Sequence, residues 1–231
     1  MGKVRALLII AAVVLGVFVV GAILVAILGR EGTRTLRLQG EVRKVELLSE
    51  RGAATLRAGS ASGAEITAHD RWIVVRPEVD ASIEDGTLRV KVSCPSLSLV
   101  SCSSDIVVTV PPTAQLDVKT VRGRMEVDGL DGPMRVLSED GDVAVRGGPP
   151  TLDARSVTGT VTADLGARPD RVLLRSETRD VRLTVPSGTY KLTADSTLGG
   201  ETVTGITSDP AAPRELIASS GKGEVFVTGT P

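Results

Sequence analysis

Aromatic side chains are almost missing from this sequence, and so are histidine, cysteine and asparagine. Only 2% of its 231 residues are aromatic, there is one histidine and there are two cysteines, and asparagine does not occur. Beyond residue 30 the aromatic residues are Trp72, Tyr190 and Phe226. Polysaccharide-cleaving β-helices need clustered acids and usually use aromatic platforms, so this composition argues against that class.

The charge balance and the missing motifs exclude further classes. A net charge of −1 argues against a nucleic-acid partner. The sequence has no Gly-x-Ser-x-Gly motif, and Gly221-Lys222 lacks the spacing of a phosphate-binding loop. His69 and Asp70 could form a base and its orienter, but we expect a surface turn there. We therefore predict no enzyme activity, no catalytic residues, no cofactor and no small-molecule substrate.

What the sequence does contain is a recurring phrase, Ser/Thr-x-x-Gly-x-Val-x-Val, in its C-terminal half. Clean copies run from Ser138 to Val145 and from Ser220 to Val227. The glycine position of the six copies is occupied by Gly123, Gly141, Gly159, Arg179, Gly199 and Gly223. These positions are 18, 18, 20, 20 and 24 residues apart, and such regular steps are typical of repeat architectures. In the fifth copy Glu201 replaces the first valine.

Each copy combines a short strand with a turn. The alternation in Val-x-Val is that of a strand with one buried face, and glycine permits a tight turn before it. A second short strand precedes each turn. Because a unit of about 20 residues cannot bury its apolar face alone, we predict that the units stack into an all-β solenoid with one shared core. The alternative is a series of hairpins that closes into a sandwich.

The N-terminus carries a long uncharged stretch, residues 6–28, directly after Lys3 and Arg5. Its 23 residues would form a helix of about 34 Å, enough to cross the roughly 30 Å hydrocarbon core of a membrane. We therefore expect a single-pass signal-anchor, with cleavage near Gly21 as the alternative. Cations after the stretch outnumber those before it, which by count alone would keep the C-terminal part in the cytoplasm. Long domains cross largely regardless of charge, so we expect that part outside.

These patterns divide the chain into four parts. Residues 1–29 would hold a cytoplasmic tip and the transmembrane helix, residues 30–38 a polar tether, residues 39–112 a β-rich N-terminal part of the ectodomain, and residues 113–231 the repeats. In the third part Asp85-Gly86 lies between two strand-like segments and predicts a hairpin. We expect this part to start the solenoid or cap it, because an open sheet edge promotes aggregation.

The only two cysteines, Cys94 and Cys102, enclose a loop of seven residues. In an exported domain such a pair predicts a disulfide. A metal site would need further ligands, and the only histidine, His69, is distant in sequence. Aspartates beside glycines, such as Asp140 and Asp142, occur in calcium-binding β-rolls, but no nine-residue register joins them. We favour plain turn chemistry and predict no metal, with calcium binding as the alternative.

Together, the N-terminal span, the cysteine loop and the recurring phrase resemble a known bacterial family. The loop Cys94-Pro…Cys102 precedes a Val-Thr-Val-Pro strand that ends at Pro111, and the phrase follows. The family is the putative-adhesin family of β-strand-repeat cell-envelope proteins, a domain of unknown function common in actinobacteria. The resemblance covers about residues 60–229. It implies a right-handed β-helix-like fold outside the membrane, and it brings no catalytic residues.

Stacking would place equivalent residues of neighbouring units one strand apart. The position after the second valine reads Asp128, Arg146 and Asp164, and the position after the glycine reads Arg124 and Asp142. We predict a ladder of opposite charges at each position, in which a pair adds roughly a few tenths of a kcal/mol and helps to set the register. The alternative is a solvated face with charges in no particular order.

Phe226 lies between Val225 and Val227, so its ring should point away from the core. We interpret it as a cap packed under a nearby loop of a terminal unit. The alternative is a contact point for a partner.

These features favour a non-catalytic module at the bacterial cell envelope. We expect an adhesin-like or scaffolding protein that binds cell-wall polymer or another envelope protein through one long face of the solenoid. The alternative is an accessory ectodomain that regulates envelope-stress signalling through a neighbouring membrane protein.

Overall fold

The computed structural model of the chain describes residues 14–16, 19, 21, 29–59, 62–94 and 102–231. Residues 14–16, 19 and 21 are helical, and the strands of the remaining described residues form two sheets of ten strands each. The first sheet contains, in spatial order, β1 (Arg30–Leu38), β4 (Ala64–Trp72), β7 (Cys102–Val110), β3 (Ala54–Ala58), β9 (Met125–Leu130), β11 (Val143–Gly147), β13 (Val161–Leu165), β15 (Val181–Pro186), β20 (Val225–Thr230) and β17 (Glu201–Thr204). The second sheet contains, in spatial order, β5 (Glu78–Glu84), β6 (Thr87–Ser93), β2 (Lys44–Arg51), β8 (Gln115–Arg122), β10 (Met134–Asp140), β12 (Thr151–Ser156), β14 (Arg171–Ser176), β19 (Glu215–Ser220), β16 (Gly188–Ser196) and β18 (Ile206–Ser208).

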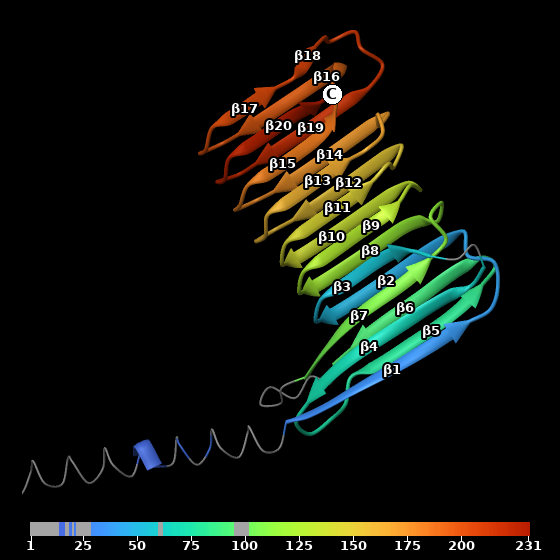
Figure 1. The fold of residues 1–231 in the computed structure, drawn as a ribbon. Coiled ribbons are helices and arrows are strands. Elements are labelled where there is room, and N and C mark those ends of the chain that lie inside the picture. The colour runs from blue at the N-terminus through green and yellow to red at the C-terminus, as the bar shows by residue number, and fades with distance from the viewer. Residues whose placement is uncertain (1–13, 17–18, 20, 22–28, 60–61, 95–101) are drawn as a thin grey trace, which may run out of the picture.

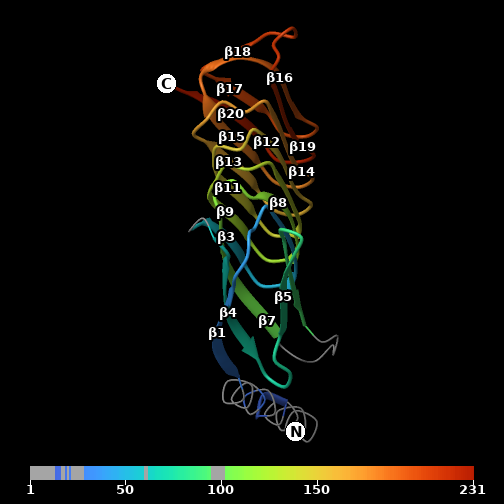
Figure 2. The same ribbon diagram turned by 90° about the vertical axis from the view of Figure 1, so that its right-hand side faces the viewer.

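The two sheets face each other as two layers along one long axis (Figures 1 and 2). From β8 to β15 the chain alternates between them, so that each repeat gives one strand to the second sheet and the next strand to the first. Within each sheet the repeat strands are parallel, and equivalent residues are register partners, as Val127 and Val145 are. The predicted all-β class is therefore confirmed, and these repeat strands are not paired as hairpins.

The interior between the layers is filled by the alternate residues of the strands. Val127, Val145 and Val227 are each at most 1% exposed. Because successive Cβ atoms point to opposite faces of a strand, every repeat that is covered on both sides adds a similar set of apolar side chains to one continuous core. Burying one such side chain contributes roughly 1.5–3 kcal/mol, so the stability of the stack comes from many equivalent layers.

The Ser/Thr-x-x-Gly part of the phrase joins one repeat to its neighbour. Ser156 Oγ accepts a hydrogen bond from the Gly159 amide at 2.8 Å and donates one to the Gly141 carbonyl of the previous repeat at 2.8 Å. The same two kinds of bond are made by Ser176, Ser196 and Ser220. This serine row explains why a serine precedes the turn by three residues in these four copies, a feature for which the sequence analysis offered no reason.

The glycine position is restricted by the approach of the neighbouring repeat. Gly141 has a φ of +148°, and a Cβ on it would overlap the carbonyl oxygen of Gly123. Gly159 lies outside the left-handed region, but a Cβ on it would overlap the Gly141 carbonyl. Backbone contact between neighbouring turns, and not only backbone conformation, therefore requires glycine here.

At the C-terminal end the layers do not follow the order of the sequence. β19 lies between β14 and β16, and β20 lies between β15 and β17. The fifth copy therefore forms the outermost layer, and the sixth lies inside it. Val225 and Val227 of the sixth copy can be covered on both sides, whereas Glu201 of the fifth copy would become an unpaired buried charge if it were enclosed. The two copies therefore exchange places, and the copy with Glu201 lies at the edge.

The N-terminal end shows a similar exchange. β2 and β3 lie between the β8–β9 and β6–β7 layers, so neither sheet is interrupted at the boundary expected near residue 112. Beyond them β4 and β1 extend the first sheet in antiparallel order, and β5 extends the second. The hairpin expected at Asp85-Gly86 joins β5 to β6, with φ values of 51° and 76° at its two residues.

The first described strand begins directly after the expected membrane span. Residues 30–38 form β1 and not a tether, because Arg34, Leu36 and Leu38 alternate with exposed residues and pair along β4. The expected transmembrane helix, residues 6–28, lies mostly outside the described residues. Among those that are described, no helix is both long and apolar enough to span a membrane.

Candidate binding face on the second sheet

One row of outward side chains crosses the second sheet with a regular order. On six successive strands, from β6 to β14, the register aligns Lys91, Leu48, Lys119, Leu137, Arg155 and Arg175. We call these six residues the central row. They alternate with buried residues of the same strands and so point away from the core. Up to Arg155, a leucine separates each cation from the next.

Three shallow cavities follow the central row and share lining residues. The first, of about 540 Å³, is lined by Leu48 and Lys119 among others. The second, of about 340 Å³, shares Lys119 and adds Leu137, and the third, of about 280 Å³, shares Arg155 with the second. We call these three adjacent cavities together the trough. It crosses seven strands from β5 to β14, which corresponds to about 29 Å at the usual strand spacing.

Acidic side chains flank the central row on both sides. Two residues before it lie Glu46 on β2, Asp117 on β8 and Asp153 on β12, and two residues after it lie Glu139 on β10 and Glu177 just beyond β14. Lys119 Nζ lies 2.7 Å from a Glu139 carboxylate oxygen, and Arg155 Nε lies 2.6 Å from one of Asp153. Within the described part of the chain, Lys91 and Arg175 have no ion-pair partner. The trough therefore offers both paired and free charges to a ligand.

Neighbouring cations hold two carboxylates of this sheet in the ionised form. Lys44 and Arg89 donate hydrogen bonds to Glu46 at 2.6 and 3.2 Å, and these bonds lower the pKa of Glu46. Lys191, 3.0 Å away, lowers the pKa of Glu215 in the same way, with a smaller contribution from Arg171 on the opposite neighbouring strand. Glu215 thus links β14, β19 and β16 across the place where the layers exchange order.

The first sheet carries the charges that the sequence analysis expected to form ladders. Its register aligns Asp128, Arg146 and Asp164 on neighbouring strands. Arg146, however, forms its ion pair with Glu126, at 3.0 Å, because this longer side chain projects from the same face of β9. Arg124 and Asp142 form an ion pair with a nitrogen–oxygen distance of 3.7 Å. These exposed pairs order the surface of the first sheet, and none of them lines the trough.

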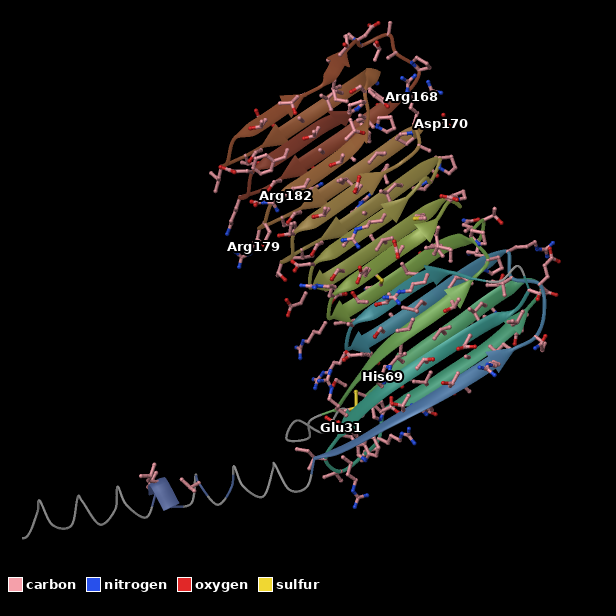
Figure 3. The ribbon with its side chains drawn as sticks, in the orientation of Figure 1. Glu31, His69, Arg168, Asp170, Arg179 and Arg182 are labelled. Carbon is pink, nitrogen blue, oxygen red and sulfur yellow. A yellow bond between two sulfur atoms is a disulfide. The ribbon has the colours of Figure 1, made fainter. Side chains whose placement is uncertain are left out.

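Phe226 lies in β20, half-exposed on the outer side of the first sheet. The guanidinium of Arg182, on the adjacent strand β15, lies 5.2 Å from the centre of its ring. Figure 3 shows Arg182 near Arg179 on one side of the stack, with Arg168 and Asp170 on the other side. Because β20 is not in the outermost layer, Phe226 does not cap the end of the stack.

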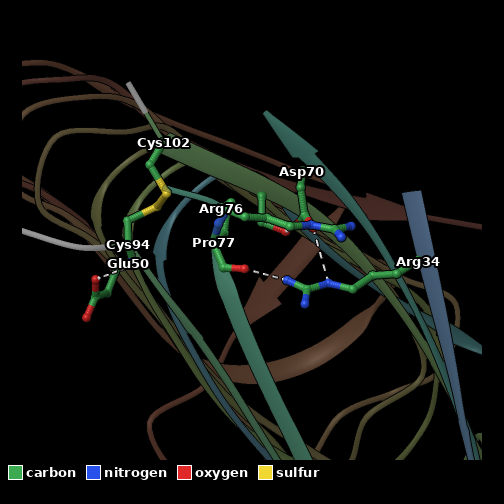
Figure 4. Close-up of a disulfide and its surroundings, with 8 residues drawn as sticks. Arg34, Glu50, Asp70, Arg76, Pro77, Cys94 and Cys102 are labelled. Carbon is green, nitrogen blue, oxygen red and sulfur yellow. Dashed lines mark hydrogen bonds and ion pairs between the residues drawn. A yellow bond between two sulfur atoms is a disulfide. The ribbon is translucent and has the colours of Figure 1, made fainter. Parts of the chain in front are cut away.

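Cys94 and Cys102 form the predicted disulfide, with their Cα atoms 5.9 Å apart (Figure 4). The bridge connects the chain just after β6 to the first residue of β7, and so ties the second sheet to the first. The residues between the cysteines lie outside the described part. Closing so short a loop contributes about 2.5 kcal/mol by the chain-entropy estimate.

The surface turn expected at His69 and Asp70 is wrong, because both residues lie in β4. Asp70 is 1% exposed, and its carboxylate lies 3.2 Å from Arg34 Nε and 2.8 Å from Arg76 Nε (Figure 4). It also accepts a hydrogen bond from Ser104 Oγ at 2.7 Å. No local pattern indicates this cluster, since Arg34 and Ser104 are each more than 30 residues away from Asp70. A buried carboxylate needs such partners, so we assign Asp70 a structural role.

Aspartates in the turns bind backbone amides. Asp131 Oδ1 accepts a hydrogen bond from the Gly148 amide at 2.8 Å, and Asp142 Oδ1 accepts one from the Thr160 amide at 2.9 Å. Across the described ranges, no three side chains of His, Cys, Asp or Glu gather as a metal site would require. Both bonds span 17 or 18 residues and so join neighbouring repeats, unlike the local bonds of an isolated turn.

The fold recurs in proteins of solved structure. A putative cell adhesion protein from Clostridium sporogenes superimposes with a TM-score of 0.54 and 13% sequence identity, over 87% of this chain and 100% of that chain. A putative adhesin from Bacteroides fragilis gives a TM-score of 0.49 and 15% identity, over 87% and 97% of the two chains. No protein-family profile and no curated protein matches the sequence. At these identities the likeness to the Clostridium protein shows a common fold.

Proposed function

We propose that this chain is a non-catalytic binding module of the bacterial cell envelope, adhesin-like or scaffolding in role. The observation that carries the proposal is the trough, a long outer face on which charged and apolar residues repeat from strand to strand. Its partner would be cell-wall polymer or another envelope protein, and not a nucleic acid or a small-molecule substrate. The name of the Clostridium protein with the same fold agrees with such a role.

We further propose that the two sheets are the halves of one right-handed, β-helix-like solenoid, as in the putative-adhesin family of actinobacterial type. Parallel pairing of strands from successive repeats and the single core between the sheets support this description. In this arrangement backbone hydrogen bonds between neighbouring strands set the register from one layer to the next. Outward rows such as the central row therefore stay aligned.

We place the module outside the cytoplasm, held by a single membrane span within residues 6–28. The disulfide supports an oxidising compartment. A reporter enzyme that is active only outside the cytoplasm, fused after Pro231, tests the orientation. Activity is the expected result, and an inactive reporter in a correctly inserted fusion would overturn the placement.

A second candidate is an accessory ectodomain that regulates envelope-stress signalling through a neighbouring membrane protein. The buried Asp70 cluster favours this signalling role. Arg34 of β1, the first strand after the expected span, forms an ion pair with Asp70 of β4 and so connects β1 to the rest of the stack. A change at the body could in this way reach the membrane-proximal strand.

Crosslinking in living cells, followed by purification of the full chain, separates the candidates. Recovery of wall glycan supports the binding module, and recovery of a membrane kinase or an anti-sigma factor supports the signalling role. A variant with Lys91→Gln and Lys119→Gln should lose the captured partner if the trough carries the function, whereas Arg146→Gln on the first sheet should keep it. Recovery of neither class of partner would refute both candidates.

A further inference from the structure

We propose that the trough binds an extended acidic polysaccharide that carries one carboxylate on every second sugar. The inference rests on the binding function proposed above and names its site and ligand class. The trough runs across the strands, and the residues along it repeat with the strand spacing. A repeating site of this shape suits a linear polymer better than a compact ligand.

The spacing of the cations sets the spacing of the ligand charges. Lys91, Lys119 and Arg155 lie on every second strand, which separates successive cations by about 9.6 Å. One strand spacing is close to the length of one β-linked sugar in an extended chain, so alternate sugars would meet a cation. Each carboxylate would then accept a charge-assisted hydrogen bond, which is stronger than a neutral one.

The leucines of the central row provide the contact for the intervening sugars. Leu48 is 37% exposed, and Leu137 is half-buried between the neighbouring cations. A sugar between two acidic sugars would lay its C–H face on one of these leucines. Covering apolar surface is favourable whether the side chain is aliphatic or aromatic, so this site does not need the aromatic platforms that the sequence lacks.

The acids of the trough decide between classes of polymer. Six cations line it, namely Arg89, Lys91, Lys119, Arg155, Arg171 and Arg175. Six acids also line it, namely Glu46, Asp80, Asp117, Glu139, Asp153 and Glu177. A polymer with a charge on every unit, such as a nucleic acid or polyphosphate, would set anions against these acids and be repelled.

A neutral polysaccharide fits less well for the opposite reason. It would leave Lys91 and Arg175, which have no ion-pair partner among the described residues, without an anion. A sparsely charged polysaccharide satisfies both groups, since its carboxylates meet the central row and its hydroxyls donate hydrogen bonds to the flanking acids.

The existing ion pairs do not block the site. Lys119 and Glu139 are 46% and 51% exposed in their side chains, and Arg155 and Asp153 are 45% and 31% exposed. An exposed pair held by one contact contributes little to stability, so Lys119 can exchange Glu139 for a ligand carboxylate. Arg155 holds Asp153 through Nε and Nη2, and its remaining N–H groups can donate to a ligand carboxylate. The flanking acids accept sugar hydroxyls.

Calorimetric titration of the full chain in detergent tests the ligand class. Three oligosaccharides of equal length serve as probes: one of alternating glucuronic acid and N-acetylglucosamine, one of N-acetylglucosamine alone, and one of galacturonic acid alone. We expect the alternating probe to bind at least tenfold more tightly than either of the others. Absence of binding by the alternating probe, or equal or tighter binding of another probe, would overturn the proposal.

Variants test the site. The double variant Lys91→Gln and Lys119→Gln should bind the alternating probe at least tenfold more weakly, and Arg146→Gln on the first sheet should bind it as the parent does. Lys91→Gln alone breaks no described ion pair, so it serves as a second test if the double variant fails to fold. Unchanged affinity in a folded trough variant refutes the site.

The outcome is distinguishable from failure of the proposed function. If the trough variants lose a captured envelope protein in cells while no oligosaccharide binds, the polysaccharide is refuted and the binding module stands. If crosslinking recovers no partner and no probe binds, both are refuted.

Discussion

In four of the repeats, a serine hydroxyl at the start of the turn serves as donor and acceptor at once. Ser156 links its own turn to that of the previous repeat through two hydrogen bonds of 2.8 Å, and it is 2% exposed. At this depth water cannot replace either bond, so the cost of losing the hydroxyl is the cost of leaving buried polar groups unsatisfied. Ser49 occupies the equivalent position in β2, where its Oγ is buried without a hydrogen-bond partner in the described structure.

The two serines make a matched pair for mutation. We expect Ser156→Ala to lower the free energy of unfolding by about 1–3 kcal/mol, because it removes the partner of the buried Gly159 amide. Ser49→Ala removes a hydroxyl that has no such bond, so it should be neutral or slightly stabilising. Chemical denaturation measures both changes, and equal losses in the two variants would contradict this account of the serine row.

The stabilising effect of the Glu215 carboxylate should depend on pH. The folded-state pKa of Glu215 is lowered from 4.5, chiefly by Lys191. A lowered pKa means that the ionised carboxylate stabilises the fold above the unfolded-state pKa, and that this contribution disappears as the pH falls through the folded-state pKa. Glu215→Gln should therefore melt below the parent protein at pH 7, and the difference should shrink on acidification below about pH 4.5. A difference in melting temperature that is independent of pH would contradict a stabilising role of the ionised Glu215 carboxylate.

At the level of the element, the repeat unit is one strand of the second sheet, a tight turn and one strand of the first. The turn is held between equivalent turns of its neighbours, with backbone facing backbone at the glycine position. At Gly141 and Gly159 a side chain has no room, although the fourth copy holds Arg179 at the equivalent position. At positions where a Cβ would meet no neighbouring atom, a glycine carries no such requirement.

Gly141 is a glycine packed against a neighbouring turn, and Gly166 is a glycine with open space at its Cβ position. Gly141→Ala should cost about 2–4 kcal/mol of unfolding free energy, because it adds backbone strain to an overlap with Gly123. Gly166 has nothing within 4 Å of its Cβ position and lies outside the left-handed region, so Gly166→Ala should stay within about 0.5 kcal/mol. Thermal and chemical denaturation give both values, and a mild effect of Gly141→Ala would show that neighbouring turns can separate.

At the scale of the whole molecule, the two ends of the stack are closed in different ways. At the N-terminal end, β1, β4 and β5 change the pairing to antiparallel. At the C-terminal end, β17 exposes its free edge with Val203 42% exposed. Glu201 occupies an inward position on that edge and accepts a hydrogen bond from the Ser196 amide at 2.8 Å. A charge placed inward on an edge strand discourages pairing with another sheet.

Glu201→Val should therefore promote end-to-end association of the chain. It restores the valine of the other repeats at an exposed edge, and both sheets could then continue into a second copy. Sedimentation velocity in detergent should show dimers or longer assemblies for this variant. Thr202→Val, the control, adds a similar apolar group on the outer face of the same strand. It should associate no more than the parent protein does. Equal association of the two variants would contradict the role of Glu201.

Local patterns in the sequence were enough to predict much of the fold. Alternation of valine with polar residues is a property of adjacent residues, and it determined which segments form strands and which side chains are buried, as at Val127 and Val145. The regular step between glycines determined the size of the repeat, and Asp85-Gly86 determined a hairpin. The disulfide between Cys94 and Cys102 followed from their number and spacing.

Other features depended on which distant segments come together. The exchange of the last two layers depends on which of the fifth and sixth copies is more stable in the position covered on both sides. The sequence of either copy alone does not indicate the answer. The partners of Asp70 and the order of the central row arise from strands tens of residues apart. Burial and register are decided by the free energy of the whole assembly, so only the tertiary structure could decide where the charged copy lies and which surface residues form the trough.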